Sequence, residues 1–375
     1  MLNSFTIENF RLFRQVEFPR LKRVNLLVGK NNSGKSALLE ALELYASNAS
    51  ITTLRDLVVD RHETWNERIA IETQWSGEVP LRHLFRGHNL PEIGMPGIVL
   101  GPSTGPMKQI QLVTGAFQTV TNEDGTLRRR MLNPSEVSDL QVEDEFEFSL
   151  IVQEGEKSRR IIRLDQASYM PTSRLAVEQE PKYPFQVVPT SNMTSQKVAA
   201  LWDMIGLTSL AEEVISGLKL IDASITGVLF VDSAGRNDAR MPLARMPLVS
   251  SNNAPEPLPL KSMGDGMTRL FHIIVALVSA KDGLLFIDEF ENGLHWSVQL
   301  EVWKTVFRLA NHLNVQVFAT THSRDCVSGF EGAWLEEPDG GAFFRLQLDV
   351  DGSSCVMNYS LDTLADSLET NVEVR

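Results

Sequence analysis

Cysteine is scarce in this sequence, with only Cys326 and Cys355 among 375 residues. Two cysteines cannot form a disulfide framework or a cysteine-rich metal site, which is typical of proteins from a reducing compartment. Long apolar runs are also missing: the longest, Leu270–Ala280, contains a histidine and is too short to cross a bilayer. The first residues lack the basic stretch and the apolar stretch of a secretory signal. We therefore expect a cytoplasmic protein without a membrane partner.

Positive charge is outnumbered by negative charge, with 35 Lys and Arg against 48 Asp and Glu and a formal net charge of -13. This balance excludes a protein that coats nucleic acid with a wholly basic surface. Two local basic clusters remain, Arg128–Arg130 and the group of Lys157, Arg159, Arg160 and Arg163. They fit contacts with DNA phosphates, and equally fit solvated strand ends that discourage edge pairing. The sequence leaves both interpretations open, so DNA is a candidate partner.

Internal repeats and sustained heptads are absent, which excludes a solenoid and a long coiled coil. Residues 3–28 predict short strands that end in the apolar run Val24–Val28, and a helical pattern starts at Lys35. Further along, residues 68–165 alternate as β-strands do, residues 195–220 show helical periodicity, and residues 233–258 predict an irregular loop. From Ser262 onward, helices alternate with buried strands, which is typical of a parallel sheet covered by helices.

The glycine-rich stretch Gly29–Ser36 reads Gly-Lys-Asn-Asn-Ser-Gly-Lys-Ser and fits the P-loop pattern G-x-x-x-x-G-K-[ST]. It lies between a predicted strand and a predicted helix, where backbone N–H groups and a helix N-terminus can bind phosphate. Lys35 is expected to reach the β- and γ-phosphates of ATP, and Ser36 to bind Mg²⁺. A glycine turn that fits by accident is the alternative, and the flanking elements argue against it. The residues expected to contact the nucleotide are Gly29, Asn31, Asn32, Ser33, Gly34, Lys35, Ser36 and Ala37.

Two carboxylates, Asp288 and Glu289, follow the apolar strand pattern Leu284–Ile287. Ligands of open α/β sheets bind at the carboxyl ends of the strands, so both side chains are expected beside the P-loop. Phosphoryl transfer needs a residue that holds Mg²⁺ and a residue that orients the attacking water. We assign the first role to Asp288 and the second to Glu289. Two solvated loop carboxylates are the alternative when this pattern is taken alone.

A third stretch, Lys261–Arg269, opens the helix before that strand and contains Ser262, Gly264 and Gly266. Ser262 is expected to cap the helix and to donate to phosphate, while the two glycines allow a close approach of the backbone. An ordinary helix N-cap preceded by glycines is the alternative.

Two shorter stretches complete the set. Residues 291–295, Glu-Asn-Gly-Leu-His, directly follow the two carboxylates, and Thr320–Ser323 follows the buried strand pattern Val315–Ala319. A lone histidine is more often structural, but His322 comes one strand after the carboxylates, at the edge where the site is expected. We therefore predict a catalytic role for His322 beside Lys35 and Glu289.

In type and order these five stretches resemble the Walker A, signature, Walker B, D-loop and switch-histidine motifs of ABC-type ATPases of the RecF, SMC and OLD group. The resemblance implies an α/β fold, a P-loop NTPase head of the ABC type with a β-rich insertion and a short helical insertion. We predict a discontinuous head formed by residues 1–66 and 255–375. The β-rich insertion is expected at residues 67–185, and a helical segment with a loop at residues 186–254.

The same resemblance implies hydrolysis of ATP with Mg²⁺ between two heads that close face to face, and hence a homodimer or higher oligomer. In that arrangement Ser262, Gly264 and Gly266 bind the γ-phosphate of ATP held by a partner copy, and His322 senses the γ-phosphate in its own head. Asp265 departs from the glycine of transporter-type ABC proteins, although the RecF-like branch often has an acidic residue there.

Residues 318–326 and 291–295 most resemble the OLD-like group of bacterial defence operons, which implies a role in anti-phage defence. Many members carry a C-terminal Toprim nuclease domain, whereas only about 50 residues follow His322, too few for such a domain. A separately encoded, nuclease-like effector is therefore an expected partner. A slow-turnover ATP sensor or scaffold and a RecF-like DNA-repair ATPase are the alternatives. Asp349–Gly352 resembles Toprim carboxylates or a Ca²⁺ loop, but we interpret it as a hairpin turn between strands at Phe343–Leu348 and Val356–Tyr359.

Asn9-Phe10-Arg11 resembles the entry strand of RecF-like heads, where a basic residue lies near the nucleotide. Arg11 is accordingly predicted to contact the nucleotide, with Arg14 or a plain solvated arginine as alternatives. A Q-loop glutamine also belongs to such heads. Three candidates stay open for it: Gln74, Gln186 and Gln196.

Overall fold

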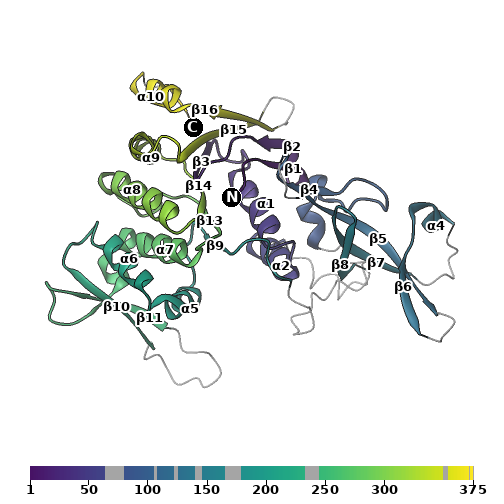
Figure 1. Cartoon of the computed structure of the whole chain (residues 1–375), viewed down its shortest axis with the longest axis horizontal. Coiled ribbons are helices and arrows are strands. Elements are labelled where there is room, and N and C mark those ends of the chain that lie inside the picture. Colours follow the sequence, from purple (N-terminus) through teal and green to yellow (C-terminus); the bar gives the residue numbers. More distant parts are fainter. Residues whose placement is uncertain are drawn as a thin grey trace.

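The computed structural model describes residues 1–63, 80–104, 108–121, 126–139, 146–164, 179–232, 245–348, 354–370 and 372–374. A six-stranded sheet lies at their centre (Figure 1). In spatial order its strands are β16 (Ser354–Tyr359), β15 (Gly341–Leu348), β3 (Val24–Gly29), β14 (Gln316–Thr320), β13 (Leu284–Ile287) and β9 (Phe185–Val188). Neighbours pair in parallel except β15 and β16, which form an antiparallel hairpin. The predicted buried strands and hairpin strands are confirmed, while the predicted turn at residues 349–352 lies outside the described residues.

A second, antiparallel sheet of seven strands lies beside the first (Figure 1). Its path is β2 (Phe13–Phe18), β1 (Phe5–Phe10), β4 (Ile98–Gly101), β5 (Ile110–Thr121), β7 (Glu147–Glu154) and β8 (Lys157–Arg163), with β6 (Leu127–Met131) paired to β5. Strands from both sides of the predicted boundary at residue 66 thus share one sheet. The strand expected at residues 68–73 lies outside the described residues.

Helices separate and cover the sheets (Figure 1). Between the two sheets lie α1 (Lys35–Ala46) and α2 (Ile51–Asp60). The other face of the parallel sheet is covered by α5 (Ser195–Ile205), α6 (Ser209–Leu218), α7 (Asp265–Ser279), α8 (Trp296–His312) and α9 (Arg324–Glu336). The remaining helical segments are short or peripheral: η1 (Pro80–Leu84), η2 (Arg86–His88), α4 (Pro134–Ser138), η3 (Leu260–Met263) and α10 (Leu361–Glu369). This layering confirms the predicted α/β class.

The parallel sheet is buried on both faces, as its apolar strands predict. On β13, Leu284 and Phe286 join the core on the α1 side, while Leu285 and Ile287 join the core on the α7 side. Each such side chain stabilises the fold by roughly 2 kcal/mol through its burial. Because both faces are fixed in this way, the carboxyl end of β13 has a defined position for the residues that follow it.

A three-stranded sheet corrects the sequence analysis. It consists of β10 (Ile225–Asp232), β11 (Arg245–Ser251) and β12 (Leu258–Pro259). The irregular loop predicted for residues 233–258 is therefore wrong over β11 and β12. Proline argued against a strand there, because proline cannot donate a hydrogen bond to a neighbouring strand. Pro247 is tolerated because it pairs with β10 alone: β12 pairs with Leu248 and Val249 and does not extend to Pro247.

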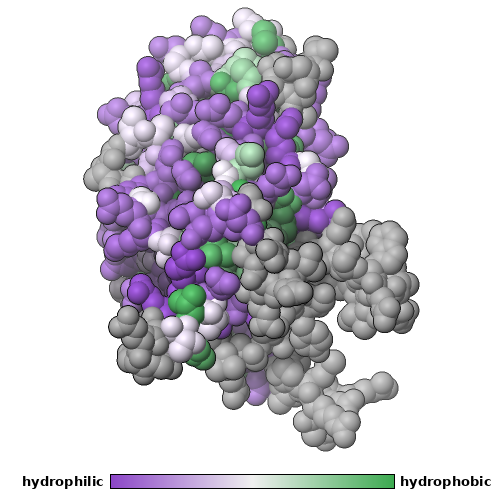
Figure 2. All heavy atoms as spheres, turned by 90° about the vertical axis from the view of Figure 1, so that its right-hand side faces the viewer, coloured by the Kyte–Doolittle hydropathy of each residue, from purple (hydrophilic) through white to green (hydrophobic). Residues whose placement is uncertain are grey.

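No helix in the described part of the chain is long and apolar enough to span a membrane. Figure 2 shows the side of the molecule that carries the antiparallel sheet. Hydrophilic residues cover most of the described surface there, and apolar residues appear as separate spots. This described surface does not present the broad apolar patch that marks a hydrophobic docking face.

Candidate nucleotide-binding site

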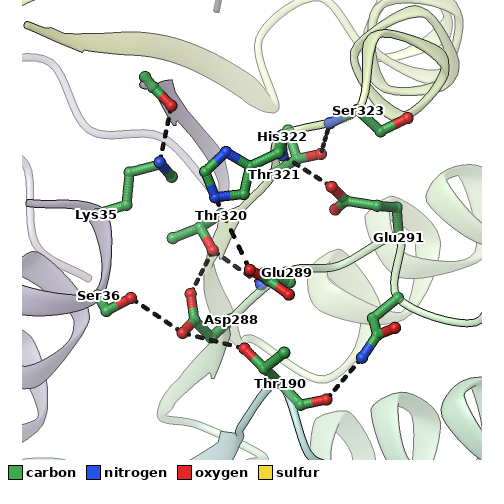
Figure 3. Close-up of polar contacts among 12 residues, drawn as sticks. Lys35, Ser36, Thr190, Asp288, Glu289, Glu291, Thr320, Thr321, His322 and Ser323 are labelled. Carbon is green, nitrogen blue, oxygen red and sulfur yellow. Dashed lines mark hydrogen bonds and ion pairs between the residues drawn. The ribbon is translucent and has the colours of Figure 1, made fainter. Parts of the chain in front are cut away.

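Four neighbouring parallel strands end at the same edge of the sheet, and each is followed by polar residues. The P-loop follows β3, Asp288 and Glu289 follow β13, and His322 follows β14. Thr190 follows β9, the outermost of the four. Figure 3 shows these side chains converging on one region, as expected for the carboxyl ends of an open α/β sheet.

The P-loop backbone depends on glycine at two positions. A Cβ on Gly34, where φ is +106°, would lie 2.6 Å from Cζ of Phe13. A Cβ on Gly29 would lie 2.5 Å from the carbonyl oxygen of Leu346 and equally close to Oγ of Ser33. The loop is therefore packed tightly against β15 and the start of β2, which fixes the beginning of α1.

The start of α1 fits a phosphate group. Gly34 is its N-cap residue and supplies no side-chain hydrogen bond to the first turn. The first N–H groups of a helix need an acceptor, and together with the helix dipole they favour an anion. Ser33 Oγ is buried and has no hydrogen-bond partner among the described residues. Both features suit the β-phosphate that the sequence predicts here.

Lys35 lies inside the P-loop, where its Nζ donates to the carbonyl oxygens of Gly29 (2.7 Å) and Lys30 (3.0 Å). Burial lowers the pKa of Lys35, while the carboxylates of Asp288, Glu289 and Glu291 oppose this effect. The ammonium group is thus held by carbonyl oxygens of the loop, where it is available to a phosphate group bound at the start of α1.

Asp288 is the centre of a cluster of hydroxyl groups (Figure 3). Its Oδ2 accepts from Ser36 Oγ at 3.0 Å and from Thr190 Oγ1 at 3.3 Å, and its Oδ1 accepts from Thr320 Oγ1 at 2.6 Å. Carboxylate and hydroxyl oxygens are the hard donors that Mg²⁺ prefers. The two residues predicted to hold Mg²⁺, Ser36 and Asp288, are therefore in contact and fit that ion.

Glu289 has an unusual backbone conformation, with φ at +50°. A non-glycine residue in this region costs about 1–3 kcal/mol and is retained where the surroundings fix it. Here the N–H of Glu289 donates to Thr320 Oγ1 (2.9 Å), and its carbonyl accepts from Arg269 Nη2 (2.8 Å). Its carboxylate lies 3.8 Å from His322 Nε2, and both side chains are more than a third exposed. The predicted catalytic pair therefore lies together at the open edge of the site.

The stretch around Ser262 corrects one prediction. Ser262 lies in η3, and α7 begins only at Asp265 with Gly264 as its N-cap, so Ser262 does not cap the helix. A short 3₁₀ turn before the helix accounts for the difference. Ser262 and Gly264 are exposed, and within the described residues Ser262 makes no hydrogen bond to the P-loop of its own chain.

The two glycines near Ser262, Gly264 and Gly266, have different surroundings. A Cβ on Gly266 would lie 2.8 Å from the carbonyl oxygen of Gly293, whereas a Cβ on Gly264 would meet nothing within 4 Å. Gly266 therefore allows residues 291–295, which resemble a D-loop and keep that name below, to pack on α7 within the chain. Gly264 supplies a backbone φ of +99°. The D-loop also reaches the switch region, because Glu291 Oε1 accepts from the N–H of His322 at 2.8 Å.

Arg11 occupies a structural position, which corrects its predicted contact with the nucleotide. Its guanidinium binds Glu40 (2.5 Å), Glu63 (2.7 Å) and the carbonyl oxygen of Leu57 (3.1 Å), and its side chain is 4% exposed. The group thus joins the β1–β2 turn to α1 and to the end of α2. The alternative, Arg14, is exposed on β2.

Three residues of the site were missed by the sequence analysis: Thr190, Arg269 and Thr320. Among the Q-loop candidates, Gln186 lies within β9, Gln196 lies exposed on α5, and Gln74 falls outside the described residues. The residue that β9 brings to Asp288 is instead Thr190. A four-residue strand followed by proline is a weak signal, but its place before a polar turn is the feature that could have indicated Thr190.

Comparison with known families agrees with this geometry. The family described as AAA ATPase domain matches residues 1–180 and 206–327. The chain belongs to this family. Membership makes this AAA ATPase domain protein an enzyme that hydrolyses ATP, on the mixed α/β P-loop fold described above.

Known relatives are distant. An "ATP/GTP phosphatase" from Helicobacter pylori is 23% identical over 336 residues, which cover 87% of this chain and 86% of that protein. An uncharacterised protein from Methanocaldococcus jannaschii is 32% identical over 90 residues, 23% of this chain and 36% of its own. Among solved structures, an Smc head bound to the C-winged helix domain of ScpA aligns over 96% of this chain and 98% of its own, at 12% identity and a TM-score of 0.49. A likeness this remote carries no information on what the AAA ATPase binds.

Proposed function

We propose that this ATPase hydrolyses Mg²⁺-bound ATP at composite sites formed by two copies of the chain. The observation that carries the proposal is the continuous set of contacts from Ser36 through Asp288 and Thr320 to Glu289 and His322. It joins a phosphate-binding loop, a metal-binding pair and a carboxylate–histidine pair within one edge of the sheet.

Each group has a defined task in this proposal. Lys35 and the N–H groups at the start of α1 bind the β- and γ-phosphates, and Ser36 and Asp288 hold Mg²⁺. The ion supplies charge neutralisation of the phosphates when it is bound. Glu289 accepts a hydrogen bond from the attacking water and orients it toward the γ-phosphate. His322, next to Glu289, donates to a γ-phosphate oxygen.

A partner copy would complete the site. Ser262 and Gly264 are exposed at the start of α7, in a stretch that resembles the motif by which related ATPases bind the γ-phosphate of a partner. Gly266 and Gly293 fix that stretch relative to the D-loop. These features support a head-to-head dimer as the active form.

The test is the oligomeric state of Glu289→Gln with and without ATP and Mg²⁺, measured by light scattering after size exclusion. Loss of the carboxylate is expected to stop hydrolysis and to retain the ATP-bound dimer. A protein that stays monomeric with ATP contradicts the composite site, and a variant that hydrolyses ATP at the wild-type rate contradicts the role of Glu289.

The downstream role proposed here is control of a nucleic-acid transaction or of a separately encoded, nuclease-like effector. The resemblance to OLD-like ATPases favours anti-phage defence, and RecF-like DNA repair is the alternative. The surroundings of Glu147 support a polyanionic partner, because Arg129, Arg160 and Arg163 all contact its carboxylate and three cationic side chains thus lie together on β6 and β8. Arg159 faces the other way, with Nη2 donating to the carbonyl oxygen of Asn48 at 2.6 Å.

DNA affinity measured at increasing salt tests this role. Binding that weakens steeply with salt, and whose salt slope decreases in Arg129→Gln with Arg160→Gln, supports contact with phosphates. Arg14→Gln, at an exposed position on β2, is the matched control. If turnover is slow and neither DNA nor a partner accelerates it, the sensor or scaffold alternative is favoured.

A further inference from the structure

Thr190 lies beside the metal-binding pair although it is 98 positions from Asp288 in the sequence. β9 pairs in parallel with β13, and the pairing of Val188 with Ile287 ends both strands at the same level. The N–H of Asp288 then donates to the carbonyl oxygen of Val188 at 3.0 Å. Sheet register therefore places Thr190 at Asp288.

Thr190 and Ser36 have matching positions relative to one carboxylate oxygen. Asp288 Oδ2 lies 3.0 Å from Ser36 Oγ and 3.3 Å from Thr190 Oγ1. Neighbouring ligands of an octahedral Mg²⁺ site, at 2.0–2.1 Å from the ion, are about 2.9 Å apart. The two hydroxyl groups thus lie at distances from Asp288 that suit adjacent positions around one ion.

The turn that carries Thr190, residues 189–193, is held on two sides. Asn292 of the D-loop donates from Nδ2 to the carbonyl oxygen of Thr190 at 2.8 Å (Figure 3). On the other side, Nη1 of Arg269 in α7 donates to Pro189 O (2.7 Å) and to Asn192 Oδ1 (3.0 Å). A second residue of α7, His272, accepts from the N–H of Met193 at Nδ1 (3.1 Å). Thr190 is therefore fixed by groups outside its own strand.

Arg269 also fixes the two carboxylate residues. Its Nη2 donates to the carbonyl oxygens of Asp288 (2.6 Å) and Glu289 (2.8 Å), and its side chain is fully buried. A buried guanidinium is costly unless its donors are satisfied. Here Nη1 and Nη2 donate to four acceptors, while Nε has no partner among the described residues. The four acceptors belong to the two segments that must keep a fixed distance for Thr190 to contact Asp288.

We propose that Thr190 is a third protein ligand of the Mg²⁺ site, next to Ser36 and Asp288, and that Arg269 positions Thr190 against the two carboxylate residues. This inference rests on the proposed Mg²⁺ site of Ser36 and Asp288. The hydroxyl of Thr190 takes a place in the metal shell, and the contacts that fix its turn compensate for the short reach of a threonine side chain.

The test is Mn²⁺ binding to the full chain with a non-hydrolysable ATP analogue, followed by electron paramagnetic resonance. Thr190→Val keeps the shape of the side chain and removes the oxygen. Mn²⁺ affinity is therefore expected to fall about tenfold or more, since loss of even an outer-shell partner costs about that much. Thr190→Ser is expected to retain it. Affinity for the metal-free analogue, read by fluorescence, should stay unchanged in both.

A second variant separates direct ligation from mere support of Asp288. Thr190→Cys offers a soft sulfur, so binding should shift from Mg²⁺ toward Cd²⁺ if residue 190 is a ligand. Thr119→Val, at an exposed position on β5, is the matched control and should bind Mn²⁺ as the wild type does. Mn²⁺ affinity unchanged in Thr190→Val, or no shift toward Cd²⁺ in Thr190→Cys, overturns the assignment.

Failure of this inference and failure of the proposed site give different results. Asp288→Asn should abolish Mn²⁺ binding if the site itself is correct. If Asp288→Asn binds Mn²⁺ normally, the whole metal site is wrong. If Asp288→Asn loses the ion and Thr190→Val does not, only the role of Thr190 is wrong. Arg269→Lys should weaken Mn²⁺ binding as well, since an ammonium cannot reach all four acceptors.

Discussion

Thr320 Oγ1 donates to Oδ1 of Asp288 at 2.6 Å and accepts from the N–H of Glu289 at 2.9 Å. One fully buried hydroxyl thus holds both residues that are proposed to bind the metal and orient water. The contact crosses from β14 to β13, so the positions of the two carboxylates depend on the pairing of these strands.

Thr320→Val is expected to lower kcat by about tenfold or more, because one Asp288 oxygen and the Glu289 N–H lose their partner. The free energy of unfolding should fall by about 1–3 kcal/mol, the usual cost of unsatisfied buried polar groups. Steady-state hydrolysis and urea unfolding measure the two effects. Thr321→Val is the matched control: Thr321 is equally buried and accepts from the N–H of Ser323 (3.0 Å), so it should lose stability while kcat changes little.

Arg11→Met should destabilise the protein rather than weaken nucleotide binding. Removing this guanidinium takes from the partly exposed carboxylate of Glu63 the arginine that it contacts and leaves Glu40 with Arg61 alone, which should cost about 1–3 kcal/mol. Thermal unfolding measures the loss, and ATP affinity of the folded fraction should stay near the wild-type value. Arg14→Met, at an exposed position, should change neither quantity. A stable Arg11→Met protein that has lost ATP would restore the nucleotide contact predicted from the sequence.

Contiguous patterns explain what the sequence could predict. The P-loop, Asp288 with Glu289, and His322 each follow a buried apolar strand, and parallel strands place their carboxyl ends at one edge. The contacts of Thr190 could not be inferred in the same way. They depend on β9 pairing with β13, and a strand of four residues, of which only Val188 is fully buried, has too little periodicity to be recognised.

Side-chain partners from distant segments explain the errors. The guanidinium of Arg11 is directed by Glu40 on α1 and by Glu63 after α2, which no local pattern reveals. Arg269 is buried on an apolar face of α7 because four acceptors from two separate segments bind its guanidinium. β11 was missed because it contains Pro247, and a proline is tolerated there only because β12 does not extend as far as that residue.

His272 should make stability depend on pH below neutrality. Burial lowers its pKa from 6.5 to about 4, and the positive charge of Arg269 adds to this effect. The unfolded chain then binds more protons than the folded one between these values, so the contribution is complete above pH 6.5 and is lost as pH falls toward 4. The loss amounts to about 3 kcal/mol at most.

His272→Gln isolates this contribution, because a glutamine oxygen can still accept from the N–H of Met193 but does not titrate. The difference in unfolding free energy between wild type and variant, measured by urea unfolding from pH 7 to pH 4, should move in favour of the variant as pH falls. His312→Gln, at the exposed end of α8, is the control and should follow the wild type. A constant difference over this range contradicts the prediction.

Gly266→Ala tests whether the D-loop must pack on α7. Near the start of a helix, alanine should stabilise by up to about 1 kcal/mol relative to glycine. Here, however, the new Cβ would lie 2.8 Å from the carbonyl oxygen of Gly293. This is a backbone atom, so no side-chain rotation can relieve the clash. The D-loop must shift, and with it the contact of Glu291 with the N–H of His322. We expect kcat to fall at least several-fold, while the free energy of unfolding measured in urea changes by less than about 2 kcal/mol.

Gly227→Ala is the control for this prediction, because a Cβ at Gly227 meets nothing within 4 Å, and it should leave kcat unchanged. A fully active Gly266→Ala protein would show that the D-loop can move without disturbing His322, and that the close approach of Gly266 to Gly293 has no role in hydrolysis.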